Sequence, residues 1–313
     1  MGQKLVVVII GLPLFAKRLA TQLSNFYPNG KFIALDTYYS KIDKLKSLWW
    51  IRRASVVFSI NGSLETSKIF DYTLKLGKPL IMNWVGTDVQ LAQKFVKNGT
   101  YRKNYIEKAI HLCEVTWIQE ELTEIGIEAT ICNFASFDKS FVLSENFTNE
   151  LAVLNYIPED RKQFYGMDIY IQLAKSNPAI HFYIAGSQAK EYQDLPKNVF
   201  PLGWVKNMDA LYDKIQVCIR IPEHDGLSTF VLEGLARGKQ VIYKYAYPHV
   251  MNCSEFSDIN MQLKEFEKQW LSKQSLINTE GADFVRNKFN SNIILGNLIN
   301  LFQDLNTKNN ATK

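Results

Sequence analysis

Short apolar runs alternate with amphipathic stretches along most of the chain. The first pair is an apolar, β-branched run over 4–10, followed by helical spacing of apolar residues over 15–24. The same alternation predicts strands at 31–35, 55–60, 79–84, 115–118 and 129–133, and helices at 64–76 and 104–112. Continuous apolar strands separated by amphipathic helices are typical of a parallel sheet covered on both faces.

The alternation stops at a polar segment, 144–150, and then begins again. The pattern predicts a second set of strands at 151–157, 180–185, 200–204, 217–221 and 240–245, with helices at 167–176, 209–214, 229–237, 280–289 and 292–305 and a frayed tail at 307–313. We therefore expect an α/β protein of two Rossmann-like, doubly wound domains that face a cleft and are hinged near residue 148. The expected boundaries are 1–147, 148–290, and a helix and tail at 291–313 that could pack back on the first domain.

The composition is that of an ordinary globular protein. Of 313 residues, 47% are hydrophobic and 21% charged, which excludes a disordered, collagen-like or coiled-coil chain. The longest apolar run, 5–10, is far shorter than the roughly 20 residues that span a bilayer. The features of a signal peptide are missing at the start, and the four cysteines lack metal-ligand spacing. We expect a cytoplasmic protein, or one peripheral on the inner face of the cell membrane.

The charge is unevenly distributed along the chain. The net charge of +5 is too small for a dedicated nucleic-acid binder. Residues 1–110, however, contain 17 Lys and Arg against 6 Asp and Glu. The first domain is therefore expected to be basic, which is compatible with an anionic small molecule, a phosphorylated acceptor or a membrane surface.

The segment 217–239 carries the most chemistry. An apolar strand is followed by a polar loop and a helix that opens near Gly226, Leu227 and Ser228. The free N–H groups and positive dipole end of that helix would form an anion site. Gly226 has no side chain to block a phosphate, and Ser228 could cap the helix and donate its hydroxyl. Glu233, two turns further on, is placed to accept two ribose hydroxyls, although a glutamate on a helix is more often a solvated residue.

This segment resembles the signature of family 4 retaining glycosyltransferases, which have the two-Rossmann (GT-B) fold. Their Glu-x7-Glu pattern reads here as DGLSTFVLEGLARGK, with Asp225 at the first acidic position and Glu233 at the second. The resemblance implies that Asp225 contacts the donor sugar and Glu233 the nucleotide ribose. The string RIPEHDGLS is similar to a bacterial and archaeal subset. Arg220 is a candidate donor-phosphate ligand, with a salt bridge to Glu223 or Asp225 as the alternative. His224 is a candidate phosphate or sugar contact, with a plain loop residue as the alternative.

The resemblance extends to the loop after the strand at 151–157. Family members hold the donor diphosphate there with an arginine and a lysine. In this sequence Tyr165 stands where the lysine before Gly166 is usual, so Arg161 or Lys162 would supply the charge. We favour Arg161, because its planar guanidinium matches phosphate oxygens. Gly186, after the strand at 180–185, would begin a loop that lies against the base.

The first domain supplies the candidate acceptor site. Gly11 follows the first strand in a loop that faces the cleft in the GT-B class, so it is expected to approach the donor, with the acceptor as the alternative. The segment NWVGTDV after the strand at 79–84 is similar to the H-W-x-G-[ST]-D of related enzymes, with Asn83 in the histidine position. The resemblance suggests Asn83, Thr87 and Asp88 as acceptor-side residues. Asp88 is also a candidate catalytic group, with a helix N-cap as its alternative role.

The segment 41–53 combines five basic residues with aliphatic residues and two tryptophans. Helical spacing predicts that much of its apolar set lies on one side. Two interpretations remain open, a peripheral contact with a membrane and a helix that covers its own sheet.

The resemblance implies transfer of a sugar from a nucleotide diphospho-sugar, with retention, to a saccharide, lipid-linked or protein acceptor in cell-surface glycan assembly. We expect a UDP-sugar rather than a GDP-sugar. No Asp-x-Asp metal motif follows a strand, so fixed cations such as Arg161 and Arg220 would stabilise the leaving diphosphate without a metal. The alternatives are a GT-B sugar-nucleotide epimerase and a glycosyltransferase-like partner subunit without activity. A nicotinamide dehydrogenase is disfavoured, because GxGxxG is missing after the first strand. The oligomeric state is left open.

Overall fold

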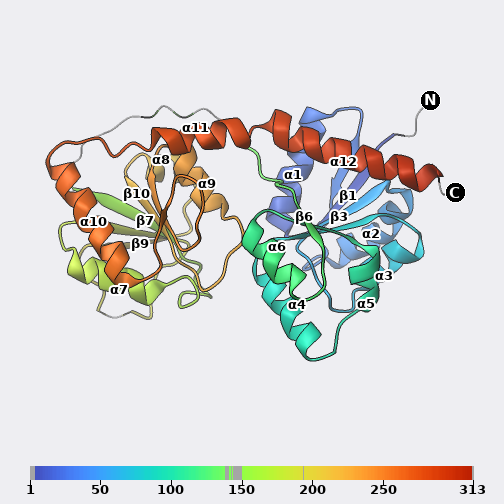
Figure 1. Ribbon diagram of the computed structural model, residues 1–313, viewed down its shortest axis with the longest axis horizontal. Coiled ribbons are helices and arrows are strands. Elements are labelled where there is room, and N and C mark those ends of the chain that lie inside the picture. Colours follow the sequence, from blue (N-terminus) through green and yellow to red (C-terminus); the bar gives the residue numbers. More distant parts are fainter. Residues whose placement is uncertain (1–3, 138–140, 142, 144–149, 193, 312–313) are drawn as a thin grey trace. The chain divides into compact units, whose positions relative to one another are not determined.

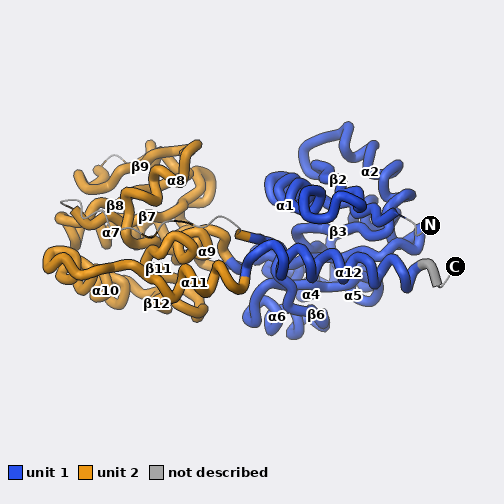
Figure 2. The backbone as a smooth tube through the Cα atoms, turned by 90° about the horizontal axis from the view of Figure 1, so that it is seen from above, with its two compact units in different colours: residues 1–136, 225–227, 289–313 blue, residues 137–224, 228–288 orange. Residues whose placement is uncertain are grey.

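The computed structural model describes residues 4–137, 141, 143, 150–192 and 194–311 (Figure 1). The chain forms two compact units (Figure 2). Unit 1 comprises residues 1–136, 225–227 and 289–313, and unit 2 comprises residues 137–224 and 228–288. The predicted hinge near residue 148 lies outside the described residues.

Unit 1 is built on a six-stranded parallel sheet of order β2-β1-β3-β4-β5-β6. Its strands are β1 (Val6–Gly11), β2 (Lys31–Ala34), β3 (Val56–Ile60), β4 (Leu80–Trp84), β5 (Ile110–Cys113) and β6 (Ala129–Ile131). Its helices are α1 (Pro13–Phe26), α2 (Lys41–Arg53), α3 (Lys68–Lys75), α4 (Thr87–Lys97), α5 (Lys103–Lys108), α6 (Thr116–Thr123) and α12 (Ser291–Ala311).

Unit 2 repeats this architecture with the strand order β12-β11-β10-β7-β8-β9, again all parallel. Its strands are β7 (Ala152–Tyr156), β8 (His181–Ala185), β9 (Val199–Gly203), β10 (Val217–Arg220), β11 (Gln240–Tyr243) and β12 (Met251–Asn252). Its helices are α7 (Met167–Ser176), α8 (Met208–Tyr212), α9 (Thr229–Ala236), α10 (Phe256–Leu271) and α11 (Thr279–Lys288).

The apolar strands are buried on both faces, as the sequence predicts. Every residue of β3, β4 and β10 is buried. In each sheet the direction of winding reverses once, between β1 and β3 in unit 1 and between β7 and β10 in unit 2. Open α/β sheets bind ligands beyond the carboxyl ends of the strands at such a switch point. Each unit therefore has a defined edge at which its functional residues are sought.

The predicted α/β fold of two Rossmann-like units is confirmed, and most element predictions are correct to within a few residues. The main error in the predicted elements falls in the region 104–118. Residues 110–112, expected to be helical, belong to strand β5, and residues 116–118, expected to be a strand, begin α6. The helix predicted to end at 305 continues to Ala311, so residues 307–311 of the expected frayed tail are helical, and the last two residues lie outside the described part.

Helix α12 completes the core of unit 1, although it is more than 150 residues away in sequence from the strands that it covers. It packs against α1 and β3 (Figure 1). The ring of Phe302 is fully buried and meets Phe58 of β3 edge to face, with 5.7 Å between the centroids. None of the described helices combines the length and the apolar character needed to cross a bilayer.

Replacing Phe302 by alanine should destabilise unit 1. A fully buried phenylalanine truncated to alanine typically costs about 3–5 kcal/mol, because burial is lost and a cavity remains. The measurement is urea unfolding followed by circular dichroism and tryptophan fluorescence. Ile293→Ala on the same helix is the matched control, because Ile293 is exposed. Equal, small effects of the two substitutions would contradict the packing of α12 described above.

Candidate functional site

The switch point of unit 2 has a buried cation. Arg220 is the last residue of β10 and is only 6% exposed. Its Nη1 donates to the carbonyl oxygen of Tyr156, the last residue of β7, at 3.5 Å. A guanidinium in a dry environment is costly unless polar or anionic groups surround it. Arg220 is therefore a charge placed where ligands of open α/β sheets bind.

Arg161 and Arg220 both lie against the ring of Tyr165. The Cζ of Arg220 lies 4.5 Å from the ring centroid of Tyr165, and the Cζ of Arg161 lies 5.6 Å from that same centroid. Arg161 also stacks on Phe164 at 3.9 Å. Among the described residues no carboxylate lies within ion-pair distance of Arg161. Two guanidiniums against one aromatic ring form a positive site that an anion would stabilise.

The backbone around these residues holds the two loops together. The amide N–H of Glu223, in the loop after β10, donates to the carbonyl oxygen of Phe164 at 2.7 Å. Gly166 precedes α7 with φ of 75°. A Cβ on Gly166 would lie 3.0 Å from Ile221, so both its backbone angle and its surroundings favour glycine at this position. The loop that contains Arg161 and Tyr165 is thereby fixed beside the end of β10.

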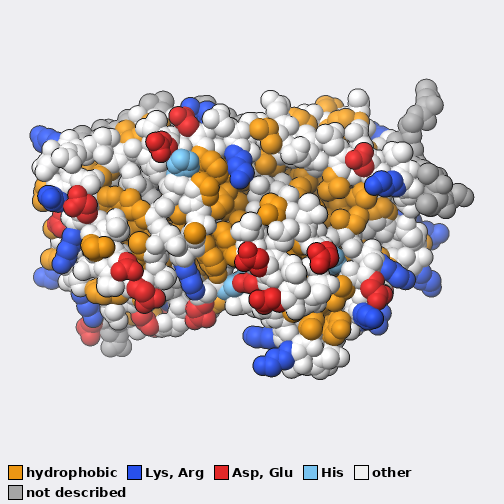
Figure 3. Space-filling model, viewed as in Figure 1, with side chains coloured by type: hydrophobic (Ala, Val, Ile, Leu, Met, Phe, Trp, Pro, Cys, Tyr) orange, Lys and Arg blue, Asp and Glu red, His pale blue; other side chains and the backbone are white. Residues whose placement is uncertain are grey.

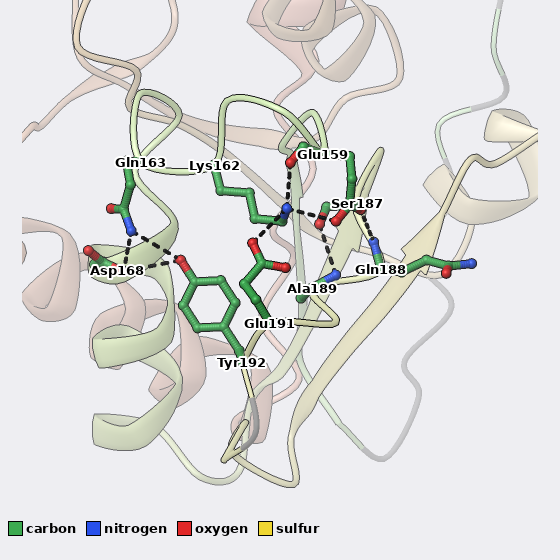
Figure 4. A network of polar contacts seen from close by, with 9 residues as sticks. All are labelled: Glu159, Lys162, Gln163, Asp168, Ser187, Gln188, Ala189, Glu191 and Tyr192. Atoms are coloured by element: carbon green, nitrogen blue, oxygen red, sulfur yellow. Dashed lines mark hydrogen bonds and ion pairs between the residues drawn. The ribbon is translucent and has the colours of Figure 1, made fainter.

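Lys162, the other predicted phosphate ligand in this loop, is already paired. Its ammonium lies 2.7 Å from the carboxylates of both Glu159 and Glu191 (Figure 4). The hydrogen bond from Lys162 lowers the pKa of Glu159 to about 2. Two carboxylates neutralise the charge of Lys162, which leaves Arg161 as the better phosphate ligand of the two.

Arg161 and Lys162 line an open pocket of about 650 Å³. Its wall also carries four carboxylates, from Glu159, Asp160, Glu191 and Glu223. The excess of acidic groups makes the Lys162 side of this pocket a poor place for a diphosphate. The positive side of the loop is where Arg161 turns toward Phe164 and Tyr165.

Helix α9 begins at the same edge of the sheet. Ser228 is its N-cap residue and is buried, but its side chain makes no capping hydrogen bond, so the predicted side-chain cap is wrong. The first N–H groups of α9 are therefore not capped by that hydroxyl, which is the arrangement found at helix-end anion sites. His224, four residues before Ser228, is buried with its ring edge-on to Tyr245, 6.5 Å away.

Glu233 lies one turn along α9 and is only partly buried. Its Oε2 accepts a hydrogen bond from the hydroxyl of the buried Tyr212 at 3.3 Å. Arg237, the C-cap residue of α9, forms an ion pair with Asp209 at 2.6 Å and so joins the end of this helix to α8. Glu233 is thus oriented by a neighbour from α8, unlike a solvated surface glutamate.

Gly186 lies at the other side of the sheet edge, after β8. Its N–H donates to the carbonyl oxygen of Gly203 at 2.7 Å, and the N–H of Gly203 donates to Ser187 at 2.9 Å. Gly186 has φ of 96°, and a Cβ there would lie 2.8 Å from the carbonyl oxygen of Ile157. The structure brings this loop to the end of β7, beside the loop that carries Arg161.

In unit 1, Gly11 lies at the switch point between β1 and β3. It has φ of 100°, and a Cβ would come within 2.0 Å of the carbonyl oxygen of Ile60. Only glycine fits this turn, so the close contact with β3 is sufficient to explain the residue. The next residue of that strand end, Asn61, has φ of 117° and donates to the hydroxyl of Tyr38 at 3.0 Å. Strained backbone of this kind is concentrated at functional sites.

Asp88 lies in the first turn of α4, directly after Thr87, which begins that helix. Its buried carboxylate accepts hydrogen bonds from four backbone N–H groups, those of Gly62 (2.7 Å), Gly86 (2.8 Å), Val85 (3.1 Å) and Val89 (3.1 Å). Burial raises the pKa of Asp88 to about 6, while these N–H groups lower it. With its oxygens engaged in this way, Asp88 is better suited to holding the loop than to acting as a catalytic acid or base. The alternative role of helix N-cap is wrong, because Gly86 is the N-cap residue of α4.

Asn83 presents an unusual polar group. It lies in β4 and is fully buried, yet neither its Oδ1 nor its Nδ2 has a hydrogen-bond partner among the described residues. An unpartnered buried amide costs about 1–3 kcal/mol. The side chain that replaces the histidine of the related motif is therefore a polar group without a structural hydrogen bond.

Three residues of the signature, Asp225, Gly226 and Leu227, are grouped with unit 1. Within that unit the Trp117 indole N–H donates to the carbonyl oxygen of Asp225 at 2.9 Å. A Cβ on Gly226 would lie 2.2 Å from the carbonyl oxygen of Val85. Packing against Val85 is therefore sufficient to require glycine at 226, whether or not a phosphate approaches this residue.

The sequence interpretation missed Glu114. This residue follows β5 at the carboxyl edge of the unit 1 sheet and is 8% exposed. Burial raises the pKa of Glu114 to about 8, although a hydrogen bond from the N–H of Phe134 lowers it. The sequence does contain a feature that points to Glu114, namely an acidic residue directly after an apolar strand. It was hidden because the strand was placed at 115–118 instead of Ile110–Cys113.

Glu114 should make the stability of unit 1 depend on pH. Its folded-state pKa is above that of the unfolded chain, so its contribution to stability is present below about pH 4.5 and is lost as the pH rises through about 8. Between pH 5 and pH 8.5 the free energy of unfolding of the wild type should therefore fall by about 4 kcal/mol more than that of Glu114→Gln. Urea unfolding at the two pH values measures this difference.

Glu124→Gln is the matched control, because Glu124 is exposed on the same segment of chain. It should follow the wild type at both pH values. If Glu114→Gln does so as well, Glu114 is not buried as a neutral acid.

The structure thus gathers the predicted residues into two sets. Unit 2 contains Arg161, Lys162, Gly186, Arg220, His224, Ser228 and Glu233, and unit 1 contains Gly11, Asn83, Thr87, Asp88 and Asp225–Leu227. Among the described residues no group of three or more His, Cys, Asp or Glu side chains could hold a metal ion.

No protein-family model matches the chain, and no curated protein matches its sequence. Solved structures do match its fold. Sucrose-phosphate synthase from Thermosynechococcus elongatus is 10% identical, with a TM-score of 0.69 over 96% of this chain and 99% of that one. HepE from Anabaena, in complex with UDP and glucose, is 11% identical, with a TM-score of 0.68 over 96% and 100% of the two chains.

TarM from S. aureus, in complex with fondaparinux, α-GlcNAc-glycerol and UDP, is 13% identical, with a TM-score of 0.62 over 83% of this chain. The chain spans about three fifths of the length of TarM, since 59% of TarM is covered. The fold of this protein is therefore that of the GT-B glycosyltransferases.

Proposed function

We propose that this protein transfers a sugar from a UDP-sugar to a saccharide, lipid-linked or protein acceptor, with retention of anomeric configuration, in cell-surface glycan assembly. The observation that carries the proposal is the pair of arginines, Arg161 and Arg220, against the ring of Tyr165 at the switch point of unit 2. Its support is the GT-B fold, together with the UDP named in the complexes of HepE and TarM.

The donor site in this proposal follows the carboxyl edge of the unit 2 sheet. Glu233 accepts hydrogen bonds from the ribose hydroxyls, and the loop at Gly186 lies against the base. Arg161 and Arg220 bind the diphosphate, assisted by the first N–H groups of α9 at Ser228. His224, buried beside this loop, contacts the phosphate or the sugar, and Asp225 contacts the sugar.

The departure of the chain from the family pattern fits this assignment. Tyr165 replaces the usual lysine, and its ring supports the guanidiniums of Arg161 and Arg220 instead. As the bond between the sugar and the diphosphate breaks, negative charge develops on the leaving group. Fixed guanidiniums and helix-end N–H groups stabilise that charge without reorganising.

The acceptor site is proposed to lie in unit 1, which contains most of the excess basic residues. Asn83 offers a buried amide without a partner among the described residues, and Thr87 opens α4 beside it in sequence. Asp88 is assigned a positioning role, because four backbone N–H groups bind its oxygens.

A second candidate function is that of a glycosyltransferase-like partner subunit without activity. The observation in its favour is Lys162, whose charge is neutralised by Glu159 and Glu191, in a loop that lacks the usual lysine. Such a subunit could still bind nucleotide. Only measured sugar transfer separates the two functions.

UDP should bind the protein and raise its melting temperature by a few degrees at 100 times the dissociation constant, which corresponds to about 2.7 kcal/mol. Glu233→Gln should weaken UDP binding by about tenfold or more, because a hydrogen bond to a charged group contributes about 1.5–3 kcal/mol. Titration calorimetry measures the affinity, with GDP, ADP, dTDP and CMP as competitors for the base site.

Glu265→Gln, on the exposed side of α10, is the matched control and should bind UDP as the wild type does. Unchanged UDP binding by Glu233→Gln would remove the ribose assignment. Binding of UDP with no release of UDP from any UDP-sugar, even with saccharide and lipid-linked acceptors present, would favour the inactive partner.

A further inference from the structure

Helix α2 exposes a stripe of large apolar side chains. Ile42, Leu45 and Trp49 are 66%, 71% and 49% exposed. Their spacing of three and four residues places them along one line of the helix surface. The side of α2 that faces its own unit is occupied instead by the fully buried Ser47 and Ile51. Much of the apolar set of this segment therefore lies on one side of α2, as expected, and that side is exposed instead of facing the sheet.

The loop before α2 extends this apolar surface with Tyr38 and Tyr39, which are 47% and 85% exposed. The carboxylate of Asp36 fixes the loop by accepting hydrogen bonds from both tyrosine N–H groups, at 3.0 and 2.9 Å. Both rings are thus held at the surface by ordered backbone. Covering of the sheet alone does not explain why these side chains are exposed.

Basic side chains surround the stripe. Helix α2 carries five exposed basic residues, Lys41, Lys44, Lys46, Arg52 and Arg53. Helical geometry places Lys41 and Arg52 on one side of the stripe and Lys46 and Arg53 on the other. The guanidinium of Arg53 stacks on the Trp49 ring at 3.6 Å. The single acid of the helix, Asp43, accepts a hydrogen bond from the N–H of Asp36 and lies 3.7 Å from Lys46.

We propose that this surface, defined as Tyr38, Tyr39 and the outward side of α2, binds an anionic lipid membrane. Aliphatic side chains at the centre, aromatic side chains at the edge and basic residues on both sides match the layers of a bilayer interface. Anionic headgroups complement the basic residues. A second copy of the chain fits less well, because pairing this surface with itself would bring like charges together.

The test uses sedimentation of the full chain with vesicles of phosphatidylcholine alone or with 30% phosphatidylglycerol. We expect the protein to bind the anionic vesicles strongly and the neutral vesicles weakly. Binding to the anionic vesicles should decrease as the salt concentration rises. The double substitution Leu45→Ser and Trp49→Ser should reduce binding by about tenfold or more, because it removes two apolar side chains from the interface. Lys41→Gln with Arg52→Gln should reduce it by about fivefold for each charge.

The matched controls are Leu91→Ser with Met261→Ser, which remove exposed apolar residues elsewhere, and Lys94→Gln with Lys97→Gln, which remove two charges from α4. Both should bind as the wild type does. All variants should keep the wild-type melting temperature and the wild-type response to UDP, so that a failure of this inference is distinguishable from a failure of the proposed function.

Equal loss in variants and controls, or equal binding to neutral and anionic vesicles, would overturn the inference. A dimer seen by sedimentation velocity that the Leu45→Ser and Trp49→Ser chain no longer forms would overturn it as well, because a second copy would then be the occupant.

Discussion

The proposed donor site of unit 2 depends on the contact of two guanidiniums with the ring of Tyr165. Arg220 reaches the ring from the end of β10, and Arg161 from the loop after β7. The parallel pairing of β7 with β10 and the hydrogen bond from Glu223 to Phe164 fix these two segments side by side. Like charges repel, so the arrangement is most stable with an anion bound nearby. In the proposed function, a diphosphate supplies that anion.

In both units, polar groups lie at the carboxyl edge of a buried parallel sheet. Because the strands are shielded from water, these groups need partners within the protein that fix their positions. Unit 1 uses backbone N–H groups, four of which bind the buried carboxylate of Asp88. Unit 2 uses side chains, with Tyr212 orienting Glu233 and Tyr165 supporting Arg220. In unit 2 the supporting contacts come from segments distant in sequence, whereas in unit 1 only the N–H of Gly62 does, and the other three neighbour Asp88 in the chain.

The fold could be predicted from the sequence because the buried strands are short, mainly apolar runs. Arg220 ends one such strand, and Ser228 and Glu233 follow it in the sequence. Other features depend on contacts that periodicity does not encode. The ion pair of Lys162 with Glu191 and the hydrogen bond from the Gly62 N–H to Asp88 join loops that are distant in sequence, and these contacts change the predicted roles of Lys162 and Asp88. Glu114 was missed because α5 is only six residues long and runs directly into β5.

We propose that Arg161 and Arg220 bind the diphosphate and not the nucleoside. Titration calorimetry of UDP and of uridine against the wild type and Arg161→Gln tests it directly, because Arg161 is only partly buried and its loss leaves the core intact. We expect Arg161→Gln to weaken UDP binding by about tenfold or more and to leave uridine binding unchanged. An equal loss for the two ligands, or no loss for either, would contradict it.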